Sequence, residues 1–98
     1  MKTEMINNDG HITIMLDGWL DTLAAPELGA AFEAINEAQS ITLDFEKVEY
    51  IASSGLRQVV AGHRKAKELN AEYSVINVCE KVMSILQMTG LEQKINIR

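Results

Sequence analysis

The sequence has 98 residues, 47% of them apolar, and this composition is typical of one small globular domain spanning residues 1–98. A domain of this size has little room for both a deep pocket and a catalytic apparatus, so a binding module is favoured over an enzyme. Nine Lys and Arg residues against fourteen Asp and Glu residues give a net charge of −5. Because such a chain repels nucleic-acid phosphates, we expect no nucleic-acid partner.

The N-terminal segment is predicted to form a β-hairpin. A short strand at Thr3–Ile6 is followed by Asn7–Gly10, whose residue types tolerate the positive φ of a tight turn. From His11 onward the side chains alternate in polarity, which predicts a strand with one buried face. The buried face would carry Ile12, Ile14 and Leu16, and the other face Thr13 and Met15.

A helix and a further strand come next. Gly18–Thr22 interrupts the alternation, and the predicted helix has Pro26 in its first turn and ends near Ala38. Its apolar residues recur at three- and four-residue steps, namely Leu28, Ala31, Phe32 and Ile35. In the strand that follows, apolar residues again alternate with polar ones, namely Ile41, Leu43 and Phe45.

The small residues of Ala52–Gly55 mark the start of a second helix, predicted to cover about Ser54 to Leu69. One face of this helix is expected to be buried, with Leu56, Val59, Val60 and His63.

The C-terminal part is predicted to add a strand over Tyr73–Val78, a helix around Val82–Leu86 with Gly90 as its C-terminal cap, and a short last strand at Ile95–Ile97. The element order is therefore β-β-α-β-α-β-α-β. Strands that alternate with helices indicate an α/β fold with a small mixed sheet, largely parallel and joined by right-handed crossovers. The first hairpin would add an antiparallel edge, and a chain this small favours helices on one sheet face.

The segment Tyr50–Arg57 is the sharpest local feature, because it joins a strand to a helix where open α/β sheets meet ligands and partners. A hydroxyl of Ser53 or Ser54 could cap the free N–H groups of the helix, which is the commoner role at such a position. The same N–H groups and the helix dipole also favour a phosphate, so either serine is suited to be a phosphoserine.

Three short motifs, in this order and spacing, carry a family resemblance over nearly the whole chain: Gly18–Asp21, Ala52–Leu56 and Met88–Leu91. They resemble the STAS domain family, the anti-sigma factor antagonists of bacteria. In that family a Gly-x-Leu-Asp segment ends an early strand, and an Asp-Ser-Ser-Gly-Leu segment opens the second helix. Ala52 departs from the family's Asp, which removes a like charge beside a future phosphate and a determinant for the kinase.

The resemblance implies partner switching, with Ser53 as the phosphorylation site and no cofactor. An anti-sigma factor that is itself a serine kinase would bind this chain and free a sigma factor. Phosphorylation of Ser53 would weaken the complex, and a phosphatase would reset it. The implied contact surface comprises Trp19, Asp21, Ser53, Ser54, Gly55 and Arg57.

Two points stay open at this stage. Asp21 would lie beside Ser53, since both follow neighbouring strands, or would simply cap the first helix. Some members of the family are instead subunits or tails of membrane transporters, for lipids or anions, and such a transport role is the alternative function.

Several other residues have structural interpretations. We expect Trp19 to pack in the core, with a partner contact as the alternative. Cys79 has no second cysteine to pair with and is interpreted as a small buried residue. His63 should be half-buried and His11 exposed, and their separation gives no metal site. A basic cluster is interpreted as a solvated helix face, or else as a patch for an acidic protein partner: Arg57, Arg64, Lys65 and Lys67.

A small serine hydrolase with Ser53, Asp21 and a histidine is disfavoured, because the sequence lacks a Gly-x-Ser-x-Gly elbow and a histidine near the serine. Nucleotide-binding glycine motifs are absent too, so no enzymatic activity is expected. No stretch is long and apolar enough to enter a membrane, and Met1–Glu4 does not begin a signal peptide. We therefore expect a cytoplasmic location.

Overall fold

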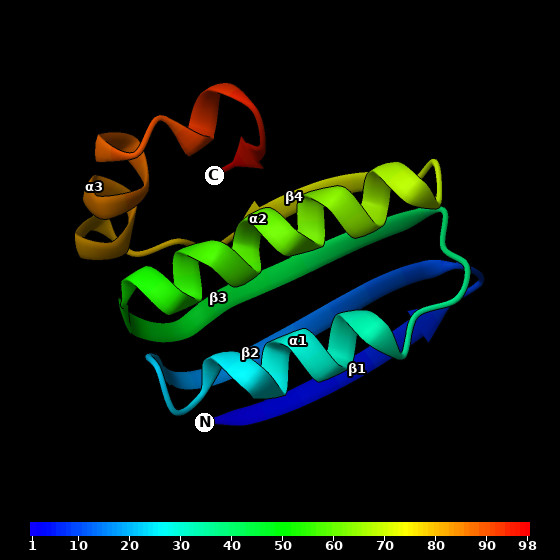
Figure 1. Ribbon diagram of the computed structural model, residues 1–98, viewed down its shortest axis with the longest axis horizontal. Helices are drawn as coiled ribbons and strands as arrows, with labels where there is room; N and C mark the ends of the chain where they lie inside the picture. Colours follow the sequence, from blue (N-terminus) through cyan, green and yellow to red (C-terminus); the bar gives the residue numbers. More distant parts are fainter.

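The computed structural model describes residues 1–98 and contains a five-stranded sheet with three α-helices. The elements follow one another as β1 (Lys2–Asn8), β2 (His11–Leu20), α1 (Ala25–Glu33), β3 (Ser40–Ile51), α2 (Ser53–Glu68), β4 (Glu72–Ile76), α3 (Glu80–Met88), a 3-10 turn η1 (Leu91–Gln93) and β5 (Asn96–Ile97) (Figure 1). This order confirms the predicted β-β-α-β-α-β-α-β arrangement. None of the helices has the length and apolar character needed to cross a lipid bilayer.

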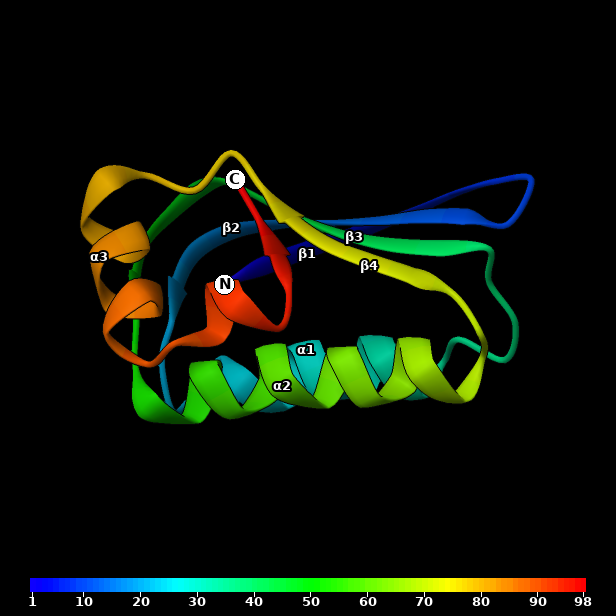
Figure 2. The ribbon, with the colours of Figure 1, turned by 90° about the horizontal axis from the view of Figure 1, so that it is seen from above.

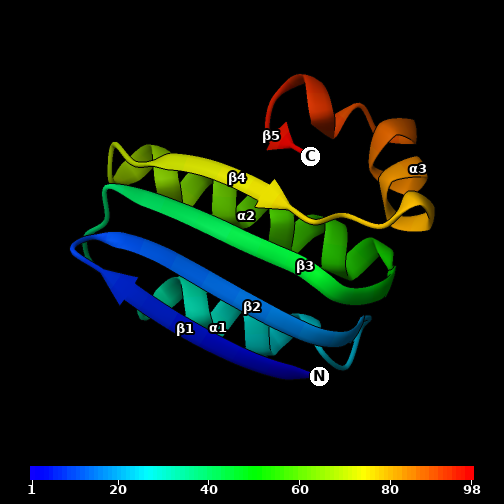
Figure 3. The same ribbon diagram turned by 180° about the vertical axis from the view of Figure 1, so that it is seen from behind.

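The strands lie in the sheet in the order β1-β2-β3-β4-β5. β1 is antiparallel to β2, and every other pair is parallel, which confirms a mixed sheet with an antiparallel edge. α1 and α2 lie side by side on one face of the sheet, while α3 lies beyond its end (Figure 2). The opposite face is not covered by any helix (Figure 3).

The core lies between this sheet and the α1–α2 layer. It contains the apolar residues that alternate along the two central strands, as predicted: Ile12, Ile14, Leu16, Ile41, Leu43 and Phe45. Each side chain of this size contributes about 1.5–3 kcal/mol when fully buried, so the two central strands supply much of the energy that holds the helices on the sheet.

Bulges bend the carboxyl ends of β2 and β3 towards the helix layer (Figure 2). The pairing register shifts between Met15 and Asp17 and again between Gly18 and Trp19, so β3 uses more residues than β2 over the same length. Gly18 has a φ of +124°, a conformation that favours glycine. β3 therefore extends beyond its alternating half and buries Val48 and Ile51 at three-residue spacing.

α1 is shorter than predicted and ends at Glu33, not near Ala38. The chain must leave the helix early because β3 begins beside the start of β2. There the backbone N–H groups of Gln39 and Ser40 both donate to the carbonyl of Gly10, at 2.7 and 3.3 Å. The predicted Ile35 still enters the core, from the loop that follows the helix.

α2 has the predicted length but buries a different stripe. Its buried residues are mostly small, namely Gly55, Val59, Gly62 and Ala66, while Leu56, Val60 and His63 are only half-buried. A Cβ atom on Gly62 would collide with the rings of Phe32 and Tyr73. The helix therefore lies so close to its neighbours that large residues fit only at the margins of the contact.

Tyr73 occupies the space that Gly62 leaves. Its hydroxyl donates a hydrogen bond of 2.8 Å to the carbonyl of Val59, inside α2, and its ring stands edge-on to Phe32. Burial raises the pKa of the Tyr73 phenol well above its ordinary value, since the charged form would lose its hydration. His63 is half-buried against the same ring, as expected.

Cys79 is exposed, so its predicted burial is wrong. It lies at the N-cap of α3, and the core contact at this point is made by the preceding residue, Val78. Gly90, by contrast, follows the end of α3 with a φ of +76°, in agreement with the predicted cap.

We predict opposite effects for alanine at two helical glycines. Gly62→Ala should lower the free energy of unfolding by about 1–3 kcal/mol, because its Cβ atom overlaps two fixed rings. Gly29→Ala in α1 meets only the flexible end of Gln58, and should raise stability by up to about 1 kcal/mol through helix propensity. Urea unfolding of both variants measures this difference, and equal effects would contradict the close contact.

We further predict that Tyr73→Phe changes how stability depends on alkaline pH. In the wild type the folded phenol stays neutral while the unfolded phenol ionises above about pH 10, so stability should fall as pH rises through that range. Ionisation of this phenol in the unfolded chain lowers the free energy of unfolding by about 1.4 kcal/mol for each pH unit above that point, and the effect is absent from Tyr73→Phe. Urea unfolding of the wild type and of Tyr73→Phe at pH 9 and pH 11 measures this difference. An equal loss of stability in the two proteins would contradict the prediction.

Candidate functional site

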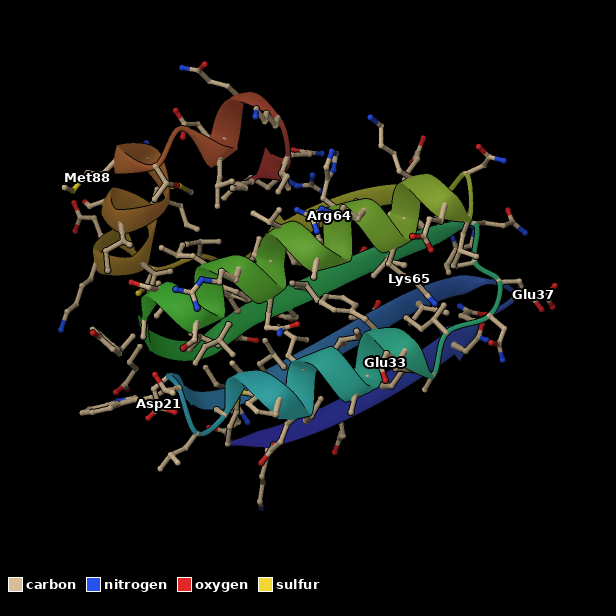
Figure 4. The ribbon with its side chains drawn as sticks, viewed as in Figure 1. Asp21, Glu33, Glu37, Arg64, Lys65 and Met88 are labelled. Atoms are coloured by element: carbon tan, nitrogen blue, oxygen red, sulfur yellow. The ribbon has the colours of Figure 1, made fainter.

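The ends of β2 and β3 form one edge of the sheet, and the site lies there. The two strands are parallel neighbours and are paired as far as Leu20 and Ile51. The backbone N–H of Ala52 then donates to the carbonyl of Leu20 at 2.9 Å. As a result, the loop after β2 and the start of α2 lie next to each other, at the end of the molecule where Asp21 is labelled (Figure 4).

Ser53 is the first residue of α2 and is exposed, which confirms its predicted position. The N-cap residue is Ala52, with an extended backbone, and no side chain caps the helix. The expected capping role of the serines is therefore wrong. The first turn of α2 also lacks acidic residues, so no carboxylate of the helix itself offsets the positive end of its dipole.

Ser54 differs from Ser53 in its surroundings. It is half-buried, and its hydroxyl donates to the Thr22 hydroxyl at 3.2 Å, which links α2 to the loop after β2. The two adjacent serines thus have different environments: Ser53 faces solvent, and Ser54 joins two segments of the fold.

Asp21 holds the shape of the loop after β2. One of its carboxylate oxygens accepts hydrogen bonds from the backbone N–H groups of Leu23 and Ala24, at 3.2 and 3.0 Å. This arrangement stabilises the turn before α1, whereas α1 itself begins after Ala24 without a side-chain cap, so the predicted helix cap at Asp21 is wrong. The Ser54–Thr22 hydrogen bond agrees with the other prediction, in which the loop that carries Asp21 lies beside the start of α2. Asp21 acts on the site through the loop, because that loop presents Thr22 to Ser54.

Gly55 is buried under the first turn of α2. A Cβ atom at this position would lie 2.5 Å from the carbonyl oxygen of Leu20 and 2.9 Å from a side-chain carbon of Ile51. Its predicted role in touching a partner is therefore wrong, since Gly55 faces the protein interior. It lets α2 approach the end of β2, while Arg57, one turn after Ser53, is exposed.

Three apolar side chains lie exposed at this edge, and we call them the Trp19 patch: Trp19, Leu23 and Tyr50, with 59%, 88% and 37% of their surface accessible. The rings of Trp19 and Tyr50 pack together with centroids 5.6 Å apart. The expected core position of Trp19 is wrong, because the bulge at Gly18 and Trp19 takes that side chain out of the buried face. Exposed aromatic residues of this kind are enriched in protein interfaces.

Sequence reasoning missed Leu23 and Tyr50 as site residues. The sequence indicated only that these two side chains do not belong to the core patterns. Leu23 lies outside the apolar stripe of α1, and Tyr50 lies outside the alternation of β3. Neither pattern indicates that Tyr50 packs against Trp19, because this contact depends on the bulged pairing of β2 with β3.

The two histidines lie far from Ser53. His63 is ten residues further along α2, or about 15 Å at the rise of a helix. His11 begins β2 at the opposite end of the sheet, where it is exposed and its Nδ1 lies 2.8 Å from the Ser40 hydroxyl. No Ser-His-Asp arrangement can therefore form at this edge.

Comparison with known proteins identifies the relatives of this chain. A family model described as "Mlab, STAS domain" matches residues 6–97. The anti-sigma-B factor antagonist of Listeria monocytogenes is 27% identical over 90 residues, which span 90% of this chain and 79% of the relative.

Two solved structures have the same fold. An anti-sigma factor antagonist from Mycobacterium paratuberculosis is similar with a TM-score of 0.88 and 22% identity, over 98% of this chain and 83% of the other. The Bacillus cell fate determinant SpoIIAA in its phosphorylated form is similar with a TM-score of 0.77 and 19% identity, over 99% and 91% of the two chains. Because the family model covers nearly the whole sequence, this chain belongs to the STAS domain family.

Proposed function

We propose that this chain is an anti-sigma factor antagonist that works by partner switching. In its unmodified form it binds an anti-sigma factor of the serine kinase type, and the sigma factor held by that kinase is released. The kinase phosphorylates Ser53, the complex dissociates, and a phosphatase restores the binding form. The similarity to the Listeria antagonist supports the choice of partner.

The single observation that carries this proposal is the position of Ser53. It is exposed, and it is the first residue of a helix that no side chain caps. A kinase can reach the Ser53 hydroxyl, because the side chain is exposed and is the first of its helix. Ser54 is less suitable, because its hydroxyl is already bonded to Thr22 and is half-buried. The free N–H groups of the first turn would stabilise a phosphate on Ser53 within the folded chain.

A phosphate on Ser53 would act mainly on the complex. It adds a charge of about −1.5 to −2 at the edge that also presents the Trp19 patch. In the free protein this charge stays hydrated, whereas a complex would remove water from it, which is unfavourable. The modification therefore weakens binding without any need to change the fold.

The Trp19 patch supports a protein partner at this edge. An aromatic pair and a leucine are exposed at the edge of the sheet where Ser53 begins α2, and binding would remove their apolar surface from water. The proposal assigns no catalytic step to this chain.

We predict that charge at Ser53, and not loss of its hydroxyl, weakens partner binding. The partner to titrate is the anti-sigma factor kinase encoded in the same genome. Ser53→Ala should bind it as the wild type does, and Ser53→Asp should bind about 1–3 kcal/mol more weakly, because an unpaired polar group is buried in the contact. Isothermal calorimetry measures both affinities.

Asn36→Asp is the matched control for that titration, because it adds the same charge in an exposed loop at the other end of α1. It should bind as the wild type does. Equal affinities for all four proteins would mean that Ser53 lies outside the contact. Phosphorylation is tested separately, by mass spectrometry after incubation with the kinase and MgATP: Ser54→Ala should still be modified and Ser53→Ala should not. Recovery of a transporter ATPase in place of the kinase would favour the transport role.

We also predict that Trp19 is a dominant contact of the same complex. Trp19→Ala should weaken kinase binding by about 2 kcal/mol or more, as is typical of tryptophan at the centre of an interface. The control is Ile6→Ala, which removes a side chain of similar exposure, 51%, from the hairpin strand β1. If both variants bind the kinase equally well, the Trp19 patch does not belong to the contact.

A further inference from the structure

A second apolar surface lies on the opposite side of α2 from the α1 contact. It is a groove of about 340 Å³ between α2 and the segment that follows α3, lined by Leu56, Arg57, Val60, Arg64, Thr89 and Leu91. Figure 4 labels Arg64 on α2, which runs past this C-terminal segment. Leu56 and Leu91 are partly buried and pack against the core, whereas Val60 is half-buried and is not among the residues that pack against it.

The charge of this groove is opposite to that of the whole chain. The chain has a net charge of −5, yet the groove is lined by two arginines and by no acidic residue. α2 itself carries four basic residues, Arg57, Arg64, Lys65 and Lys67, and its one acidic residue is Glu68 at its end. The surface therefore combines an apolar floor with a positive rim.

The groove does not have the character of a small-molecule site. Such sites place a few buried polar groups among apolar ones, and none of the three polar residues that line this groove, Arg57, Arg64 and Thr89, is buried. Exposed arginines around an apolar floor fit a protein segment in which apolar side chains are flanked by carboxylates.

We propose that this groove binds an acidic segment of the anti-sigma factor, in which apolar residues contact Leu56, Val60 and Leu91 while carboxylates pair with Arg57 and Arg64. This rests on the proposed function, since it names a second contact of the same partner. The groove is continuous with the Ser53 edge, because Arg57 lies one helical turn from Ser53, at i+4 on the same face.

The position of Arg57 connects the two contacts. A phosphate on Ser53 would come within reach of the Arg57 guanidinium, which would then form a charge-assisted hydrogen bond within the chain. An arginine engaged in this way no longer pairs with a carboxylate of the partner. Modification of Ser53 would thus weaken the contact at the groove as well as the contact at the edge.

The test uses three variants titrated with the anti-sigma factor kinase of the same genome by isothermal calorimetry. Arg64→Glu reverses the charge at the far end of the groove, and Val60→Glu places a carboxylate on its floor. Lys67→Glu is the matched control, because it makes the same charge reversal at an exposed position of the same helix outside the groove. Circular dichroism and thermal unfolding establish that each variant is folded.

We expect Arg64→Glu and Val60→Glu to bind the kinase at least tenfold more weakly than the wild type, and Lys67→Glu to stay within about threefold. Wild-type affinity in both groove variants, together with weak binding of Ser53→Asp, would overturn the groove contact and leave the proposed function intact. An equal loss in Lys67→Glu would also overturn it, because net charge would then explain the effect. A kinase that does not bind the wild type would overturn both proposals.

Discussion

The contact between the end of β2 and the start of α2 is the constraint on which the rest of the site depends. The Ala52 N–H donates to the Leu20 carbonyl, and Gly55 places the first turn of α2 directly on that residue. No larger residue fits at position 55, so the approach is fixed by the absence of a single Cβ atom. Because β2 and β3 are parallel neighbours, this contact also brings the loop after β2 beside Ser53.

Much of the fold could be predicted from the sequence because it depends on local patterns. Alternation at Ile12–Leu16 and Ile41–Phe45 identified the central strands and their buried faces, and Gly90 correctly indicated the end of α3. The position of Ser53 at the start of α2 followed from the small residues around it. These features need no knowledge of which elements pack together.

The remaining features depend on tertiary contacts that a single sequence does not specify. Trp19 was expected in the core, but bulged pairing between two distant strands exposes it. The buried stripe of α2 was misassigned because close packing against Phe32 and Tyr73 selects glycine and alanine over larger apolar residues. The absence of a serine cap follows from where the helix begins: the N-cap position is Ala52, so both serines lie inside the first turn, where the hydroxyl of Ser54 donates to Thr22.

Ser53 begins the helix that lines the groove and follows the strand that carries Tyr50 of the Trp19 patch, so we infer that a single modification acts on both surfaces. The most direct test of this switch compares the affinity of the anti-sigma factor kinase for the unmodified chain and for the chain with authentic phosphoserine incorporated at position 53. We expect the phosphorylated chain to bind at least tenfold more weakly, with an unchanged far-ultraviolet circular dichroism spectrum, since the charge acts at the contact. Equal affinity of the two forms would contradict control of partner binding by Ser53.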